Sequence, residues 1–109
     1  IVTGGFSALK TEVSHTTITG AGKLALSAND FGLYAMSGAL VTIENCEIDC
    51  DGSFGTDNNN VEVTINNSTI TAKGKTFETM RGIQKLTLNG CAITEPEGAV
   101  YDPTLRDSW

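Results

Sequence analysis

The chain has 109 residues, enough for one domain around one core, and its 13 acidic against 7 basic residues give a net charge of −6. The basic residues are scattered along the sequence, which excludes nucleic acid and disfavours an anionic membrane surface as partners. No apolar run is long enough to insert into a membrane, and the many Thr, Asn and Gly residues favour short strands and tight turns over helices.

The N-terminal third contains short strands with alternating apolar residues. Residues 1–3 look like the second strand of a repeat unit whose first strand is absent, and with no initiator Met we expect 1–109 to be one domain cut from a longer chain. Two further strands are expected around Thr17–Ile18 and residues 24–26. We align Leu24 and Leu26 with Cys46 and Ile48, 22 residues later, with one extra residue in the Gly-Ala-Gly turn between the two strands.

The central part of the chain carries an internal repeat. Three segments superimpose at offsets of 22 and 23 residues: Val41–Ile48, Val63–Ile70 and Leu86–Ile93. Each reads apolar-Thr-apolar, then two polar residues, then a small residue, a variable residue and Ile. This pattern predicts two short strands that meet at a corner.

A third apolar position follows the second strand by about seven residues and predicts a third strand in each repeat. Its members are Leu9, Leu33, Phe54, Phe77 and Val100. Gly52, Gly74 and Gly98 lie in the connection before it, where a positive φ is cheap for glycine. The sequence therefore predicts an all-β solenoid of about four to five coils of 22–23 residues, with three short strands per coil stacked about 4.8 Å apart.

Stacking of the coils predicts which side chains form the core. The expected inward residues are Val41, Ile43, Cys46, Ile48, Val63, Ile65, Ile70, Leu86, Leu88 and Ile93. Cys46 and Cys91 lie two coils apart, about 9.6 Å, which is too far for a disulfide, so we expect Cys46, Cys50 and Cys91 to be reduced. The cysteine spacing does not fit a zinc site either.

The corners carry a resemblance to a known family. Asn45, Asn67 and Gly90, each between an apolar-Thr-apolar strand and a small-x-Ile strand, resemble the asparagine-ladder turn of right-handed parallel β-helix proteins, the pectate-lyase-like solenoids. The resemblance covers roughly residues 16–101. It implies a secreted or cell-surface bacterial protein, in a family where some members bind or cleave acidic polysaccharides and others form adhesin shafts.

A leucine-rich repeat is the alternative fold, because residues 83–93 also satisfy its consensus phrase. The fit fails at the leading apolar position, which is Gly38 in one repeat and Asn60 in the next. The rest of each repeat also lacks the spaced leucines of the convex segment.

One outward face is the candidate ligand-binding surface. Its predicted members are Thr42, Thr64 and Thr87 in one column and Glu44, Asn66 and Asn89 in the next, with Thr17 and Thr19 extending both columns. Hydroxyl and amide groups in such columns can bind sugar hydroxyls. The competing interpretation is that Thr is simply a favourable outward strand residue.

An acidic group forms the candidate metal site. Glu47, Asp49 and Asp51 alternate along one strand and Asp57 follows in the next loop, so these carboxylates could hold calcium or form a solvated edge. No other cofactor is expected. His15, the one histidine, has no Ser and Asp partners for catalysis, and the arginines lie far from Asp49.

These observations favour a non-catalytic module that presents the Thr, Asn and acidic face to carbohydrate or acts as an adhesin-type spacer. The alternative is a fragment of a polysaccharide-active lyase or hydrolase. We further expect the N-terminal edge to self-associate, because it exposes unpaired strands, and Leu105 and Trp109 to fold over the other end.

Overall fold

The protein is all-β and built from parallel sheets. The computed structural model describes residues 2–3, 7–12, 15–28, 31–36, 38–55, 61–72, 80–81, 83–95 and 97. Sheet A contains, in spatial order, β1 (Val2–Thr3), β4 (Lys23–Ser27), β7 (Glu47–Cys50), β10 (Thr69–Ala72) and β13 (Ala92–Glu95). Sheet B contains β11 (Met80–Arg81), β8 (Ser53–Gly55), β5 (Phe31–Met36) and β2 (Ser7–Glu12). Sheet C contains β12 (Ile83–Asn89), β9 (Val61–Asn66), β6 (Leu40–Glu44) and β3 (His15–Thr19).

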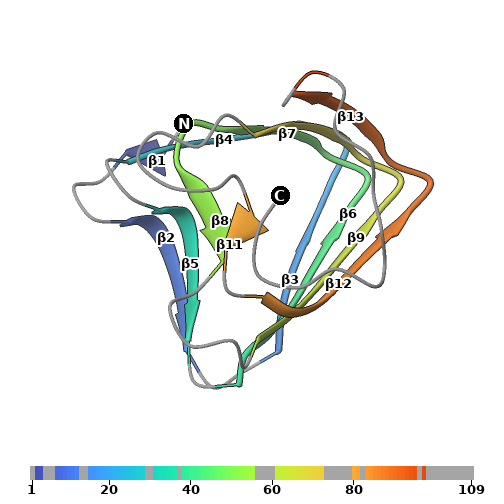
Figure 1. Cartoon of the computed structure of the whole chain (residues 1–109). Helices are drawn as coiled ribbons and strands as arrows, with labels where there is room; N and C mark the ends of the chain where they lie inside the picture. The colour runs from blue at the N-terminus through green and yellow to red at the C-terminus, as the bar shows by residue number, and fades with distance from the viewer. Residues whose placement is uncertain are drawn as a thin grey trace.

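The chain visits the three sheets in a fixed order, from C to A to B and back to C. Each strand from β1 to β10 pairs in parallel with the strand three elements further along, so each passage through the three sheets stacks on the one before it. In Figure 1 the sheets form three walls around a common interior. We call one passage a coil.

The predicted ladders of the central repeat are confirmed. Val41 pairs with Val63 and Val63 with Leu86 in sheet C, while Ile48, Ile70 and Ile93 stack in sheet A. The match of Thr17 and Ile18 to the central repeat is also confirmed, since these residues pair with Thr42 and Ile43.

The alignment of the second strand in the first full coil was wrong by two residues. Leu24 pairs with Ile48 and Leu26 with Cys50, rather than with Cys46 and Ile48. A shift by two keeps the same residues on the inner side, so the alternation pattern could not reveal it.

The core lies between the three sheets. All ten residues predicted to face inward belong to it or pack against it, although Leu88 and Ile93 are half-buried. Further residues are buried that were not among the ten predicted core residues: Leu26, Leu33, Ala35, Ala39, Cys50, Val61, Ala72 and Ile83. Leu33 and Ala35 come from the six-residue strand β5 of sheet B, and Val61, Ala72 and Ile83 lie at strand ends.

The corner from sheet C to sheet A is the most regular turn of the structure. Asn45, Asn67 and Gly90 have φ of 57°, 50° and 63°, the left-handed region that Asn and Gly tolerate best. Asn45 N–H donates to Asn66 O of the next coil at 3.0 Å, and Asn67 N–H donates to Asn89 O at 2.8 Å. The Asn45 and Asn67 side chains are exposed, so they form an outward turn rather than an interior ladder.

In the connection to sheet B, Gly52 is buried. Met80 pairs with Phe54 in sheet B, a position with which the repeat had aligned Phe77. Phe77, Gly74, Gly98, Val100, Leu105 and Trp109 lie outside the described residues. The three cysteines are free. Three sheets without a helix in the described residues do not fit the leucine-rich repeat, whose coils carry one strand each.

Candidate ligand-binding face

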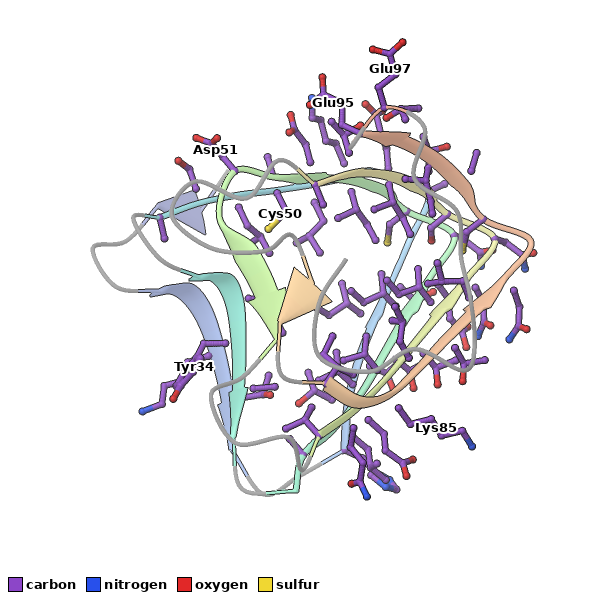
Figure 2. The ribbon with its side chains drawn as sticks, in the orientation of Figure 1. Tyr34, Cys50, Asp51, Lys85, Glu95 and Glu97 are labelled. Carbon is purple, nitrogen blue, oxygen red and sulfur yellow. The ribbon has the colours of Figure 1, made fainter. Side chains whose placement is uncertain are left out.

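The outer side of sheet C presents three parallel columns of side chains, which we call the sheet C face. The registers place in the first column His15, Leu40, Glu62 and Lys85, in the second Thr17, Thr42, Thr64 and Thr87, and in the third Thr19, Glu44, Asn66 and Asn89. Figure 2 shows Lys85 pointing away from the interior at the β12 end of this face. The structure thus assembles the two columns expected from the sequence and adds one more.

The threonine column runs through all four strands of sheet C. Thr17 is exposed, and Thr42, Thr64 and Thr87 are half-buried between their neighbours. Strands of one sheet lie about 4.8 Å apart, so the column is a row of hydroxyl groups at nearly constant spacing. Each hydroxyl can both donate and accept a hydrogen bond.

The third column carries amide and carboxylate groups. Asn89 Nδ2 donates to Asn66 Oδ1 at 2.8 Å, which orients both amides along the column. This bond uses one of the two amide protons of Asn89 and one lone pair of Asn66, so each amide keeps polar capacity for solvent or a ligand.

A shallow hollow of ≈ 190 Å³ lies on the sheet C face. It is lined by His15, Thr17, Leu40, Val41, Thr42, Glu62 and Thr64. His15, Leu40 and Glu62 belong to the column that the ligand prediction left out. The sequence carried a signal for this column, because Leu40 and Glu62 alternate with the inward residues Val41 and Val63. Residues two apart on a strand point to the same side of the sheet.

Glu62 and Lys85 are both exposed and lie opposite each other on the neighbouring strands β9 and β12. This register predicts an ion pair between their side chains.

The acidic group lies on sheet A and contacts a lysine from the neighbouring coil. Lys23 Nζ lies 3.2 Å from Asp49 Oδ2 and 3.8 Å from Glu47 Oε1. Asp51 Oδ2 instead accepts a hydrogen bond from Ser27 Oγ at 3.3 Å. Lys23 contacts these carboxylates because it lies opposite Glu47 in the corrected alignment of β4 with β7.

The carboxylates therefore do not converge on one point. Among the described residues no group of three or more His, Cys, Asp and Glu side chains is placed to hold a metal ion. Asp57 lies outside the described residues, and calcium binding by Glu47, Asp49, Asp51 and Asp57 stays a prediction.

Cys50 is a buried thiol on the inner side of sheet A, as Figure 2 shows. Burial raises the pKa of this thiol. Its Sγ donates a hydrogen bond to Gly52 O at 3.3 Å. A neutral, buried thiol is a poor nucleophile. Cys50 therefore acts as a small core residue.

Comparisons of the chain with protein-family models, with curated proteins and with solved structures find no match. Within the described part of the chain, no helix has the length and apolar character that crossing a membrane requires. Function must therefore be argued from the geometry of the sheet C face.

Proposed function

We propose that the chain is a right-handed parallel β-helix module without catalytic activity, and that it binds carbohydrate through the sheet C face. The fixed order of the three sheets and the in-register stacking of their strands support the β-helix assignment. The corner residues that resemble the family turn, Asn45, Asn67 and Gly90, have the left-handed backbone that such a turn requires.

The observation that carries the binding proposal is the arrangement of polar groups around the hollow. Thr42 and Thr64 line it with hydroxyls, Glu62 with a carboxylate and His15 with an imidazole, while Leu40 provides an apolar patch. Sugars present hydroxyls that both donate and accept, together with apolar C–H faces. The strands hold these groups in fixed positions before a ligand arrives, which reduces the entropic cost of binding.

The charge of the face favours a neutral carbohydrate. Glu44 and Glu62 project from neighbouring strands of the face, and the whole chain carries a net charge of −6. A polymer of uronic acids would be repelled by these carboxylates. We therefore propose a neutral polysaccharide as the ligand of a secreted or cell-surface bacterial protein.

Affinity electrophoresis in gels that contain neutral or acidic polysaccharides tests the proposal. Migration of the native chain should be retarded by a neutral polysaccharide, and Thr64→Val should weaken the retention by about fivefold because it removes one hydrogen bond of about 1 kcal/mol. Thr69→Val is the matched control, since Thr69 is exposed on sheet A, and it should bind like the native chain.

Equal retention of both variants, or the absence of retention by any polysaccharide, would contradict the binding face and leave the spacer role. The alternative enzyme is tested by release of reducing ends or unsaturated uronate. Turnover that is abolished by Asp49→Ala would refute a non-catalytic module.

A further inference from the structure

The hollow on the sheet C face extends further across the strands than along them. Its lining residues come from three neighbouring strands, β3, β6 and β9, which lie side by side in Figure 1, but apart from Val41 from only two of the three columns. Two strand spacings amount to about 9.6 Å, whereas adjacent columns lie about 6.6 Å apart along a strand. The hollow therefore follows the stack of coils, and it leaves out the third column, which contains Asn66.

The two directions on this face differ in what they repeat. Along a strand the outward groups change at every step, from Glu62 to Thr64 to Asn66 in β9. Across the strands one group recurs at steps of about 4.8 Å, the threonine hydroxyl of the second column. A polymer of identical sugars can therefore make the same contact through every sugar only if it lies across the strands.

The spacing of the threonines selects among sugar linkages. In β-1,4-linked glucose or mannose both bridging bonds of each ring are equatorial, so the chain is extended, and each sugar advances it by slightly more than the strand spacing of about 4.8 Å. Sugars and threonines thus stay in step over the three coils of the hollow. In α-1,4-linked glucose one bridging bond of each ring is axial, so the chain coils and leaves the row after the first sugar.

The side chains of the hollow suit such a chain. Successive sugars of a β-1,4-linked chain are turned over and present opposite edges to the face, and a threonine hydroxyl can serve either edge because it both donates and accepts. Leu40, on the middle of the three strands, offers an apolar surface to the C–H groups of a ring. Thr42 and Thr64 are half-buried between their neighbours, which holds their hydroxyls in place before a ligand binds.

We propose that the sheet C face binds a neutral β-1,4-linked glucan or mannan that lies across the strands, with one sugar on each coil. This inference rests on the proposed function and adds the linkage and the orientation of the ligand. Thr17, Thr42 and Thr64, which line the hollow in three successive coils, each bond to a different sugar, and Leu40 packs against the middle one. Asn66 lies beside the bound chain and does not contribute to its binding.

The first measurement compares linkages and needs no variant. Isothermal titration measures the affinity of the native chain for three neutral pentasaccharides: β-1,4-linked glucose, β-1,4-linked mannose and α-1,4-linked glucose. At least one β-linked ligand should bind about 25-fold more tightly than the α-linked one, because only an extended chain reaches the second and third threonines and each hydrogen bond contributes about fivefold. The α- and β-linked glucose chains carry the same hydroxyl groups, so their comparison isolates the shape of the chain.

The second measurement tests the orientation of the bound chain. Thr17→Val and Thr64→Val should each weaken binding of the β-linked pentasaccharide about fivefold, and the double variant about 25-fold, because the two hydroxyls lie about 9.6 Å apart and contact different sugars. Asn66→Ala changes the same strand as Thr64 but outside the hollow, so it should bind like the native chain, as should Thr69→Val on sheet A. Circular dichroism establishes that each variant is folded before its affinity is measured.

Two kinds of result would overturn the linkage or the orientation while the proposed function stands. The linkage is wrong if the α- and β-linked pentasaccharides bind equally, or if a neutral polysaccharide retards the native chain but neither β-linked pentasaccharide binds. The orientation is wrong if Asn66→Ala weakens binding as much as Thr64→Val and Thr17→Val has no effect, the pattern expected for a ligand that lies along β9. A native chain that no polysaccharide retards and that binds no pentasaccharide contradicts the proposed function itself.

Discussion

At the scale of single residues, one close approach in the core ties sheet A to sheet B. Gly32 in β5 is buried, and a Cβ added to it would run into Cys50 Sγ and come within 3.4 Å of Leu26 Cβ. Cys50 is held in place by its position in the row of Leu26 and Ala72 and by its bond to Gly52 O. The space that glycine leaves is filled by this sulfur.

Gly32→Ala should therefore destabilise the protein by about 1–3 kcal/mol, the usual cost of overpacking a core. Cys50→Ala removes the obstructing sulfur, so the double variant should be more stable than the sum of the two single changes predicts. Urea unfolding followed by circular dichroism measures the three free energies. Gly22→Ala is the control, because its Cβ meets nothing within 4 Å, and an equal loss at both glycines would contradict the contact.

The raised pKa of Cys50 makes stability depend on pH on the alkaline side. The folded thiol keeps its proton to a higher pH than the unfolded thiol, whose ordinary pKa is 9.0. The free energy of unfolding is independent of this group below that pH and falls as the pH rises above it, because the unfolded thiol then ionises more readily than the folded one. Stability should thus fall above about pH 9, and Cys50→Ala should flatten this fall relative to Cys46→Ala.

At the scale of elements, the corner from sheet C to sheet A determines how successive coils lie on one another. The left-handed residue lets the chain turn while its N–H reaches a carbonyl of the next coil. Gly90 belongs to this row for a further reason: a Cβ there would lie 2.7 Å from Asn67 Oδ1 of the preceding coil. A side chain at position 90 would therefore require the Asn67 amide to move.

Substitutions at Asn67 should separate the contribution of its positive φ to stability from the contribution of its side chain. Asn67→Ala forces an ordinary side chain into the left-handed region, at a cost of about 1–2 kcal/mol, whereas Asn67→Gly should cost less than about 1 kcal/mol. Thermal unfolding of both variants gives the comparison. A glycine variant as unstable as the alanine variant would mean that the side chain, not φ, stabilises the corner.

The elements that could be predicted from the sequence are those with a long alternating pattern. Sheet C was predicted in register because Val63, Ile65 and their equivalents flank outward threonines over five or six residues. The misalignment of Leu24 arose because a shift by two preserves the inner side of a strand, and with it the contact of Lys23 with Asp49 was missed. Sheet B strands of two or three residues carry too little pattern to distinguish Met80 from Phe77.

At the scale of the whole molecule, one core runs through all coils. Residues from every sheet belong to a continuous buried cluster, and each coil contributes too few apolar side chains to be stable alone. Most of its pairings join residues more than twenty positions apart, which makes folding slow compared with a helical protein of the same length.

The loss of stability caused by truncating a core side chain should therefore depend on its position along the stack of coils. Ile65→Ala in β9, where the side chain is fully buried, should cost about 2–5 kcal/mol. Ile93→Ala in the outermost strand β13 should cost less, because that side chain is only half-buried. Urea unfolding at low protein concentration measures both, and a larger loss at Ile93 would contradict a core centred on β9.

The identical register of β6 and β9 has a consequence for how such a protein can change its length. Val41 lies opposite Val63, and 22 residues separate them, so a tandem duplication of residues 41–62 would insert one complete turn and return every later side chain to its former environment. A duplication that does not span a whole coil would place inner residues on the wrong wall. Such a protein therefore lengthens by whole coils, and slipped copying of the gene would add one further threonine to the outer column with each coil.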